Sequence, residues 1–316
     1  MSARRQAWVV WLVVGLAACA RVGPSAAPLS KTAAEAPEPS SPGPEAAPAA
    51  QNTKPAKAAS PHGKRALYRK SCELGSALAC NELAILLIEE PQQALPLLER
   101  ACSLGLPRGC ANLGMQLLYA TKSPERERAL ELLTRSCNES DDYGCLELAN
   151  ALYDDAKQSG GGAFSRPYGL YQTACKLGNM DACCSEGWML RNAEGTSKDA
   201  RRARELFRFA CEQQSYAGCA ALGYELMESA NNAEDQAEGA RFLKLACEHD
   251  DAFGCFTLGA AILGSAGPQG ADTGLALLKR ACALGSPNAC EYAGAVEQRL
   301  KQGLAASGDE DDDADD

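Results

Sequence analysis

The chain has 316 residues, of which 46% are apolar and 23% are charged, so it can bury a sizeable core and is not a wholly disordered polymer. Its formal net charge is -10, and the final nine residues, "GDEDDDADD", carry seven of the acids. No basic stripe that could bind phosphates is visible, and we therefore expect no nucleic-acid partner.

The first residues have the organisation of a secretory signal peptide. Arg4 and Arg5 form a positive start, and the apolar run from Ala7 to Ala18 is too short to span a bilayer as a helix, which needs about twenty residues. The run ends in "LAAC", which resembles the bacterial lipobox, where the peptide is cut before the cysteine and the cysteine is acylated. We predict a signal peptide over residues 1–18 and lipidation at Cys19, with an ordinary cleavage site beside a chance cysteine as the alternative.

This lipid would anchor the chain to the cell envelope. Ala20 is not the aspartate that resembles an inner-membrane retention signal in enteric bacteria, so the outer membrane is favoured. The sequence leaves open whether the body faces the periplasm or the cell surface.

Two segments have compositions that do not support a packed core. Residues 19–61 are rich in Ala, Pro and Ser and are predicted to form an extended, disordered tether. Residues 303–316 are acidic and rich in Gly and Ala, and are predicted to be a disordered tail. The folded body is predicted to lie between them, over residues 62–302.

The body contains seven pairs of cysteines, each with seven residues between its two members. The pairs are Cys72/Cys80, Cys102/Cys110, Cys137/Cys145, Cys175/Cys183, Cys211/Cys219, Cys247/Cys255 and Cys282/Cys290. Their first members follow one another at intervals of 30 to 38 residues, which indicates an internal repeat of about thirty-five residues.

Each repeat has the pattern of two helices joined at the cysteine pair. Apolar residues stand five and four positions before the first cysteine, as at Leu97 and Leu98, and the second cysteine opens a stripe such as Leu113, Gly114 and Leu117. The small residue inside the second helix predicts close approach of a neighbouring helix. Glycines three positions after the first cysteine are predicted to end the first helix in the left-handed conformation. These are Gly75, Gly105, Gly178 and Gly285, whereas Ser140, Gln214 and Asp250 leave the other three ends open.

The period and the recurring "A-x-x-L-L-x-x-A-C-x-L-G" pattern resemble Sel1-like repeats, which are related to tetratricopeptide repeats. The two cysteines per repeat resemble the Helicobacter cysteine-rich proteins, which are secreted, disulfide-bridged solenoids of this kind. The resemblance covers about residues 62–301 and implies an all-α fold, an α/α solenoid of about seven repeats. The fourth repeat departs from the pattern through the loop 157–167, the extra Cys184, and Glu186 in place of leucine.

The cysteine pairs fit disulfides better than a metal or redox site. Zinc sites and thioredoxin-like motifs use close C-x-x-C spacing, which does not occur here, and we predict no metal site. A short turn between antiparallel helix ends brings two cysteines within bridging distance, and the export signal leads to an oxidising compartment. We therefore predict seven local disulfides, with Cys184 as a buried, inert free thiol. A reactive or intermolecular Cys184, or its replacement of Cys183 as the partner of Cys175, are the alternatives.

Enzyme chemistry has little support in the sequence. The Helicobacter family has been linked with penicillin binding and weak β-lactamase activity, which makes a β-lactam-binding enzyme the alternative function. However, no serine is followed three residues later by a lysine, as in S-x-x-K, and H-E-x-x-H is absent. We predict no catalytic residue, no cofactor and no enzymatic activity.

A polar column on the second helix of each repeat is the candidate binding face. Positions two, six and nine after the second cysteine share one side of this helix, which in such solenoids lines the concave face. The candidates are Glu82, Asn112, Gln116, Tyr119, Glu147, Asp154, Asn192, Glu225 and Glu228. The column is acidic and rich in amides, and predicts a groove for an unidentified basic or extended protein or peptide segment. A solvated acidic face, or a purely structural envelope lipoprotein, are the competing interpretations.

Overall fold

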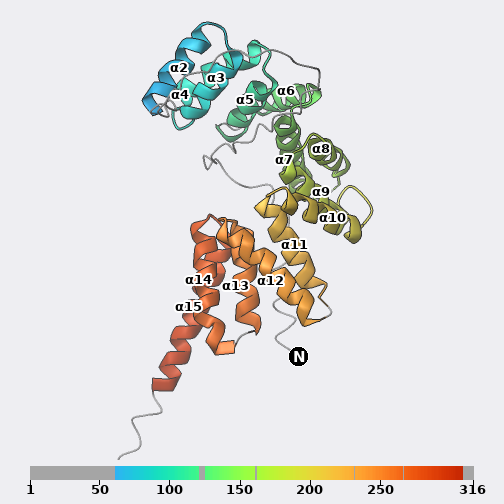
Figure 1. Cartoon of the computed structure of the whole chain (residues 1–316), viewed down its shortest axis with the longest axis vertical. Helices are drawn as coiled ribbons and strands as arrows, with labels where there is room; N and C mark the ends of the chain where they lie inside the picture. The colour runs from blue at the N-terminus through green and yellow to red at the C-terminus, as the bar shows by residue number, and fades with distance from the viewer. Residues whose placement is uncertain (1–60, 121–124, 161, 231, 266, 309–316) are drawn as a thin grey trace, which may run out of the picture.

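A computed structural model describes residues 61–120, 125–160, 162–230, 232–265 and 267–308. These residues form fourteen α-helices and no strand (Figure 1). The helices are α2 (Pro61–Glu73), α3 (Ala77–Leu86), α4 (Pro91–Ser103), α5 (Pro107–Ala120), α6 (Glu125–Asn138), α7 (Asp142–Gln158), α8 (Ser165–Lys176), α9 (Met180–Asn192), α10 (Ala200–Glu212), α11 (Tyr216–Glu228), α12 (Ala233–Glu248), α13 (Ala252–Ser265), α14 (Gly267–Ala283) and α15 (Pro287–Gly308).

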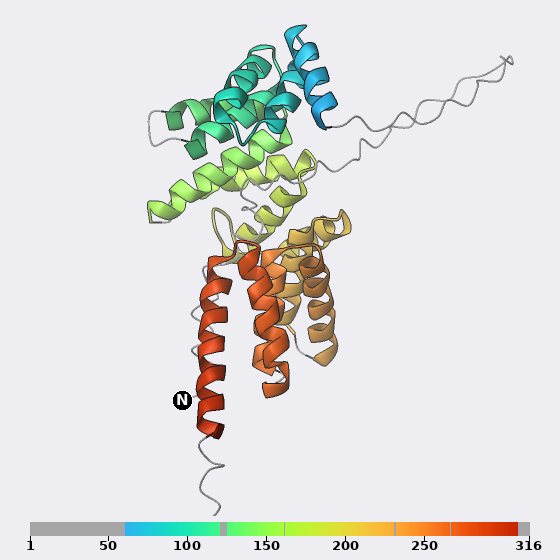
Figure 2. The same cartoon turned by 90° about the vertical axis from the view of Figure 1, so that its left-hand side faces the viewer.

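The helices stack one after another along the long axis of the molecule (Figures 1 and 2). Each even-numbered helix ends near the first cysteine of a pair, and the following odd-numbered helix carries the second. Every helix packs against its sequence neighbours, and odd-numbered helices also contact each other in the pairs α3 with α5, α5 with α7, α9 with α11, and α11 with α13. The chain is therefore an α/α solenoid, as the repeat pattern predicts.

We call the turn between the two helices of a cysteine pair a joint. Each joint contains one residue in the left-handed backbone conformation, three positions after the first cysteine. The four predicted glycines have left-handed backbone conformations with φ between 84° and 98°. Ser140, Gln214 and Asp250 adopt the same conformation, with φ of 63°, 66° and 63°, although they carry side chains. All seven joints therefore have the same left-handed turn, including the three helix ends for which the sequence made no prediction.

A polar residue four positions before the second cysteine caps the start of the odd-numbered helix in six repeats. Its side-chain oxygen accepts a hydrogen bond from the backbone N–H three residues later, which satisfies one otherwise unpaired donor. These caps are Ser76, Asp141, Asn179, Ser215, Asp251 and Ser286. The sequence contains this signal, and our prediction of the helix starts did not use it.

The predicted leucine stripes form the core. Leu83, Leu113, Leu148 and Leu222 of the odd-numbered helices are buried, as are Leu98 and its counterparts Leu133, Phe207, Leu243 and Leu278 of the even-numbered helices. The small-residue column marks close helix crossings, as predicted. A Cβ atom added to Gly223 would lie 2.7 Å from the carbonyl oxygen of Gly239, so α11 and α12 approach each other almost backbone to backbone.

The C-terminal helix ends later than the sequence suggests. We predict a disordered tail from residue 303, but α15 continues to Gly308. Leu304, Ala305 and Ala306 are good helix formers, which accounts for the extension. The predicted signal peptide, Cys19, nearly all of the predicted tether, and residues 309–316 lie outside the described residues. Among the helices that the structure describes, none combines the length and apolar character that crossing a membrane requires.

Candidate functional site

All seven predicted disulfides are present. They join the pairs Cys72–Cys80, Cys102–Cys110, Cys137–Cys145, Cys175–Cys183, Cys211–Cys219, Cys247–Cys255 and Cys282–Cys290. In every pair the two Cα atoms lie 4.5 or 4.6 Å apart, inside the range that a disulfide accommodates. Each bond therefore links the last turn of an even-numbered helix to the first turn of the next odd-numbered helix.

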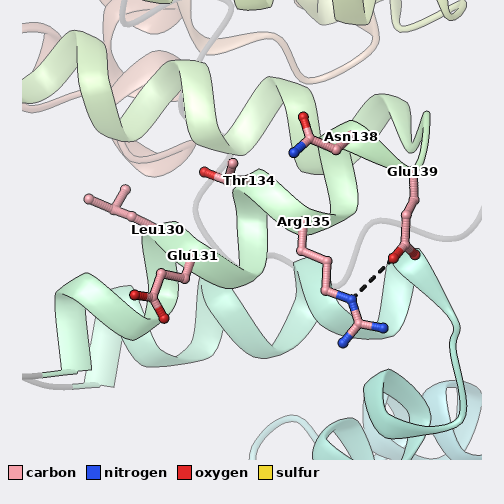
Figure 3. Close-up of a pocket in the computed structure, with 6 residues that line it drawn as sticks. All are labelled: Leu130, Glu131, Thr134, Arg135, Asn138 and Glu139. Carbon is pink, nitrogen blue, oxygen red and sulfur yellow. Dashed lines mark hydrogen bonds and ion pairs between the residues drawn. The ribbon is translucent and has the colours of Figure 1, made fainter.

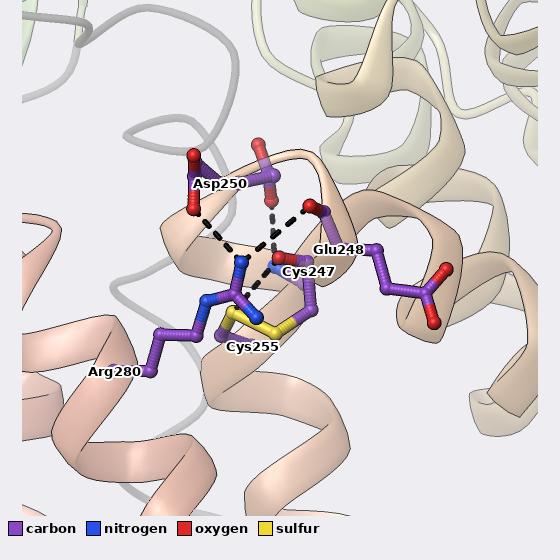
Figure 4. Close-up of a disulfide and its surroundings, with 7 residues drawn as sticks. Cys247, Glu248, Asp250, Cys255 and Arg280 are labelled. Atoms are coloured by element: carbon purple, nitrogen blue, oxygen red, sulfur yellow. Dashed lines mark hydrogen bonds and ion pairs between the residues drawn. A yellow bond between two sulfur atoms is a disulfide. The ribbon is translucent and has the colours of Figure 1, made fainter.

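At two of these joints, an arginine from the following repeat donates hydrogen bonds to the end of the even-numbered helix. In Figure 4, the guanidinium of Arg280 on α14 reaches the joint that holds Cys247 and Cys255. Its Nη2 donates to the carbonyl oxygen of Glu248 at 3.4 Å and to Oδ1 of Asp250 at 2.9 Å. Arg100 on α4 donates in the same way to the carbonyl oxygen of Glu73, at 3.2 Å. Both arginines stand two positions before the first cysteine of their repeat and place a cation at a helix C-terminus, where it is stabilising.

The prediction of a free thiol at Cys184 is wrong. Cys184 is fully buried on α9 and is disulfide-bonded, and the described part of the chain contains no free cysteine. Replacement of Cys183 is also excluded, because Cys175 bonds to Cys183. One step along a helix turns a side chain by about 100°, and Cys184 accordingly faces α11, with its Sγ 3.7 Å from the carbonyl oxygen of Ala217.

The predicted binding column is not uniformly open. Glu82, Asn112, Gln116, Glu147 and Asp154 are half-buried, Asn192 and Glu228 are exposed, Glu225 is buried, and the side chain of Tyr119 lies outside the described part. Asn112 donates from Nδ2 to Oδ1 of the buried Asn81 at 2.7 Å, so part of its hydrogen-bonding capacity is used inside the protein. Some residues of the column are therefore accessible to a partner, whereas others are engaged in contacts inside the protein.

Glu225 is a structural member, contrary to its predicted role as an open acid. Only 6% of this residue is exposed. Its carboxylate accepts from Nε of Arg191 at 2.6 Å, and Nη2 of Arg204 lies 3.6 Å from its other oxygen. The Arg191 guanidinium also lies over the rings of Tyr224 and Trp188, at 4.9 and 5.5 Å from their centroids. This cluster ties α9 and α10 to α11 and leaves no free carboxylate for a partner.

Three other carboxylates, Glu147, Asp181 and Asp251, have no cationic partner; we call them the acidic row. They belong to α7, to the start of α9 and to the cap of α13, and none of them forms an ion pair with a described lysine or arginine. Glu147 instead accepts a hydrogen bond from Asn150 at 3.1 Å, and Asp181 accepts one from Ser215 at 3.3 Å. Sequence spacing identified only Glu147, because the other two stand at helix starts, outside the column.

Desolvation raises the pKa of all three carboxylates. The pKa of Glu147 rises to about 7 and that of Asp251 to about 6, in both cases mainly because the surrounding protein excludes water, with a smaller contribution from the charge of Asp181. The Asp181 side chain reaches solvent on one side, but protein atoms surround its other sides, and this partial burial raises its pKa as well. The row is therefore a set of acids without an ion pair to a described lysine or arginine, in which Asp181 repels the other two.

The fold is shared with solved structures. No family model matches the sequence, and no curated protein matches it either. A Sel1 repeat protein from Oxalobacter formigenes superposes with a TM-score of 0.55 at 18% identity, over 66% of this chain and 89% of that chain. This chain has the Sel1-repeat fold. A protective antigen of uropathogenic Escherichia coli with an SLR fold gives a TM-score of 0.33 at 20% identity, over 74% of this chain and 59% of that one. Yeast Tom70 gives 0.47 at 11% identity, over 76% and 60%.

The hollows on the surface of this Sel1-repeat solenoid are shallow. One of about 450 Å³ is lined by Leu130, Glu131, Thr134, Arg135, Asn138 and Glu139, all from α6 or directly after it (Figure 3). There Arg135 pairs with Glu139 at 3.1 Å, and Glu131 is a second acid in the lining. Another of about 320 Å³ lies between α2 and α4 and includes Arg69 and Arg100. Within the described ranges, no group of three or more potential ligands could hold a metal ion.

Proposed function

We propose that this Sel1-repeat chain is a scaffold that binds a basic, extended segment of a partner protein along its odd-numbered helices. The acidic row is the observation that carries the proposal. Glu147, Asp181 and Asp251 are partly desolvated and form no ion pair with a described lysine or arginine, and Asp181 repels the other two, so a lysine or arginine placed among them would remove an electrostatic cost already present in the free protein. The partner itself is not identified.

The packing of the odd-numbered helices supports this choice of face. Successive odd-numbered helices contact each other in four places, whereas each even-numbered helix packs chiefly against its two odd-numbered neighbours. In a curved stack, the elements on the inner side lie closest together, and we infer that the odd-numbered helices line the concave side. Concave solenoid surfaces suit extended partners.

The proposal includes attachment to the cell envelope, for which the support comes from the sequence. The "LAAC" motif and the apolar run before it favour lipidation at Cys19 and the outer membrane. Metabolic labelling with a fatty-acid analogue tests this: the label should be incorporated into the wild-type chain and lost in Cys19→Ala. The β-lactam alternative stays a prediction, and steady hydrolysis of a chromogenic β-lactam would favour it over the scaffold.

The scaffold is tested by the binding of a fluorescent peptide with alternating lysine and glycine, measured by polarisation at low salt. We expect saturable binding that weakens at least about tenfold in the triple variant Glu147→Gln, Asp181→Asn, Asp251→Asn. A matched control removes three acids from the even-numbered helices, Glu131→Gln, Glu205→Gln and Glu212→Gln, and should weaken binding less than about threefold. Equal losses in the two variants would show that net charge, and not the acidic row, attracts the peptide.

A further inference from the structure

The first helix of the solenoid differs from every later even-numbered helix in how it is covered. The helices α4 to α14 each pack between the preceding and the following odd-numbered helix, but α2 packs chiefly against α3. No described helix precedes α2, so the side that is covered in later repeats faces outward. This side is the N-terminal face of the stack.

The N-terminal face exposes leucines. Leu67 stands five positions before the first cysteine of its repeat, and its counterparts in the six later repeats are all half-buried or buried. Leu67 itself is 62% exposed, and the neighbouring Leu74 and Leu78 are 80% and 60% exposed. Leu104 and Leu177, the counterparts of Leu74, are exposed as well, so the exposure of Leu67 is what distinguishes this end of the solenoid, and an exposed leucine on an uncovered helix side suits contact with another surface.

The helix that forms this face is basic, in a chain whose net charge is -10. Lys64, Arg65, Arg69 and Lys70 are all exposed, and Glu73 is the only acid of α2, so the helix carries four positive charges against one negative. By helical spacing Lys64 and Lys70 flank Leu67 on the N-terminal face, whereas Arg65 and Arg69 lie on the opposite side of α2, toward α3 and α4. None of these four cations pairs with a carboxylate of the described chain. Arg65 donates to the carbonyl oxygen of Leu86 at 2.9 Å, which holds its guanidinium at the surface.

The position of α2 indicates what the face meets. The helix begins at Pro61, where the predicted tether from Cys19 ends, so a lipid at Cys19 would keep this end of the body near a bilayer. An exposed leucine flanked by lysines on a helix matches the interfacial region of a membrane containing anionic lipids. We infer that α2 docks the N-terminal face of the solenoid onto the anionic phospholipid surface of the membrane that holds the anchor. The inference rests on the anchoring part of the proposed function and not on peptide binding by the acidic row.

The test is co-sedimentation with vesicles, using the chain from Ala20 onward, which retains every described residue and carries no lipid. The vesicles contain either 30% phosphatidylglycerol in phosphatidylcholine or phosphatidylcholine alone. We expect binding to the anionic vesicles only, a loss of affinity of at least about tenfold in Lys64→Gln, Lys70→Gln, and a partial loss in Leu67→Gln.

The matched control is Lys198→Gln, Arg208→Gln, which removes two exposed cations at and beside α10 and should bind like the wild type. Equal affinity of the two double variants, or equal binding to both kinds of vesicle, would overturn the inference. Self-association that disappears in the α2 variant would also overturn it, since the acidic tail of a second copy would then be the occupant. The peptide assay with the acidic-row variant is read separately, so failure of one proposal does not affect the other.

Discussion

Arg191 on α9 and Glu225 on α11 form a nearly buried ion pair between consecutive repeats, with Nε and Oε2 2.6 Å apart. The sequence places these residues 34 positions apart, and no local pattern connects them. Because of this pair, the carboxylate of Glu225 is not available to a partner. The acidic row forms no such ion pair with a described lysine or arginine.

Removing the carboxylate of Glu225 should destabilise the solenoid. Glu225→Ala leaves Arg191 and Arg204 without their shared partner in a half-buried place, and we expect a loss of about 2 kcal/mol in the free energy of unfolding. Urea unfolding followed by circular dichroism measures it. Glu228→Ala is the control, because Glu228 is exposed and 3.8 Å from Arg191, and should cost less than about 0.5 kcal/mol. Equal effects would contradict the structural role assigned to Glu225.

Reduction should loosen the solenoid at every joint. Each disulfide closes a loop of about nine residues, for which chain entropy gives a stabilisation of about 2.5 kcal/mol. We expect a reductant to lower the melting temperature by well over ten degrees, and the single pair Cys211→Ser, Cys219→Ser to lower it by several degrees. A melting temperature that changes by only a degree or two on reduction would exclude a stabilising role.

A glycine at the left-handed turn of the fifth joint should stabilise it. Gln214 is held at φ 66°, where a side chain is unfavourable and glycine is not. We expect Gln214→Gly to raise the free energy of unfolding by about 0.5–1 kcal/mol. Gly178→Gln makes the reverse change at the equivalent position of the fourth joint and should lower the stability by a similar amount. No gain from the first variant would indicate that this turn is not left-handed.

The stability should fall as the pH rises from about 4.5 to 7. Burial raises the pKa of Glu147 from its usual 4.5 to about 7, so between these values the folded state binds the proton and the unfolded state does not. The stabilisation is fully present below pH 4.5 and is lost once the pH has risen through 7, which should lower the free energy of unfolding by about 2 kcal/mol. Glu147→Gln should reduce this fall. Peptide binding should strengthen over the same range, because the carboxylate becomes charged.

The state of Cys184 can be read from a count of thiols. The seven pairs use fourteen of the sixteen cysteines, and Cys19 and Cys184 remain. We expect alkylation after denaturation without reductant to leave Cys184 unmodified in the unlipidated full chain, because Cys184 is disulfide-bonded. A modified Cys184 in the unlipidated chain would contradict the structure.

The repeat made the fold predictable. The helix pairs, the disulfides, the leucine stripes and the glycine turns could be predicted because the same spacing occurs seven times, and one local geometry has to account for all seven copies. The candidate site was less predictable, since a carboxylate can bind a partner protein only if it has no ion-pair partner in another repeat. Helical spacing selected Glu225 without revealing Arg191, and it passed over Asp181 and Asp251, which belong to helix starts. Cys184 is disulfide-bonded although it stands outside the repeated cysteine spacing, so the pattern gave no sign of its bond.

The disulfides also determine how the chain responds to a cut. Each closes a small covalent ring within one joint, and none of the seven joins two repeats. A nick inside the ring of Cys211 and Cys219 leaves the polypeptide in one piece, whereas a nick between Cys219 and Cys247 severs it. After such a cut, only the packing of neighbouring helices, such as α11 against α12, holds the two fragments together.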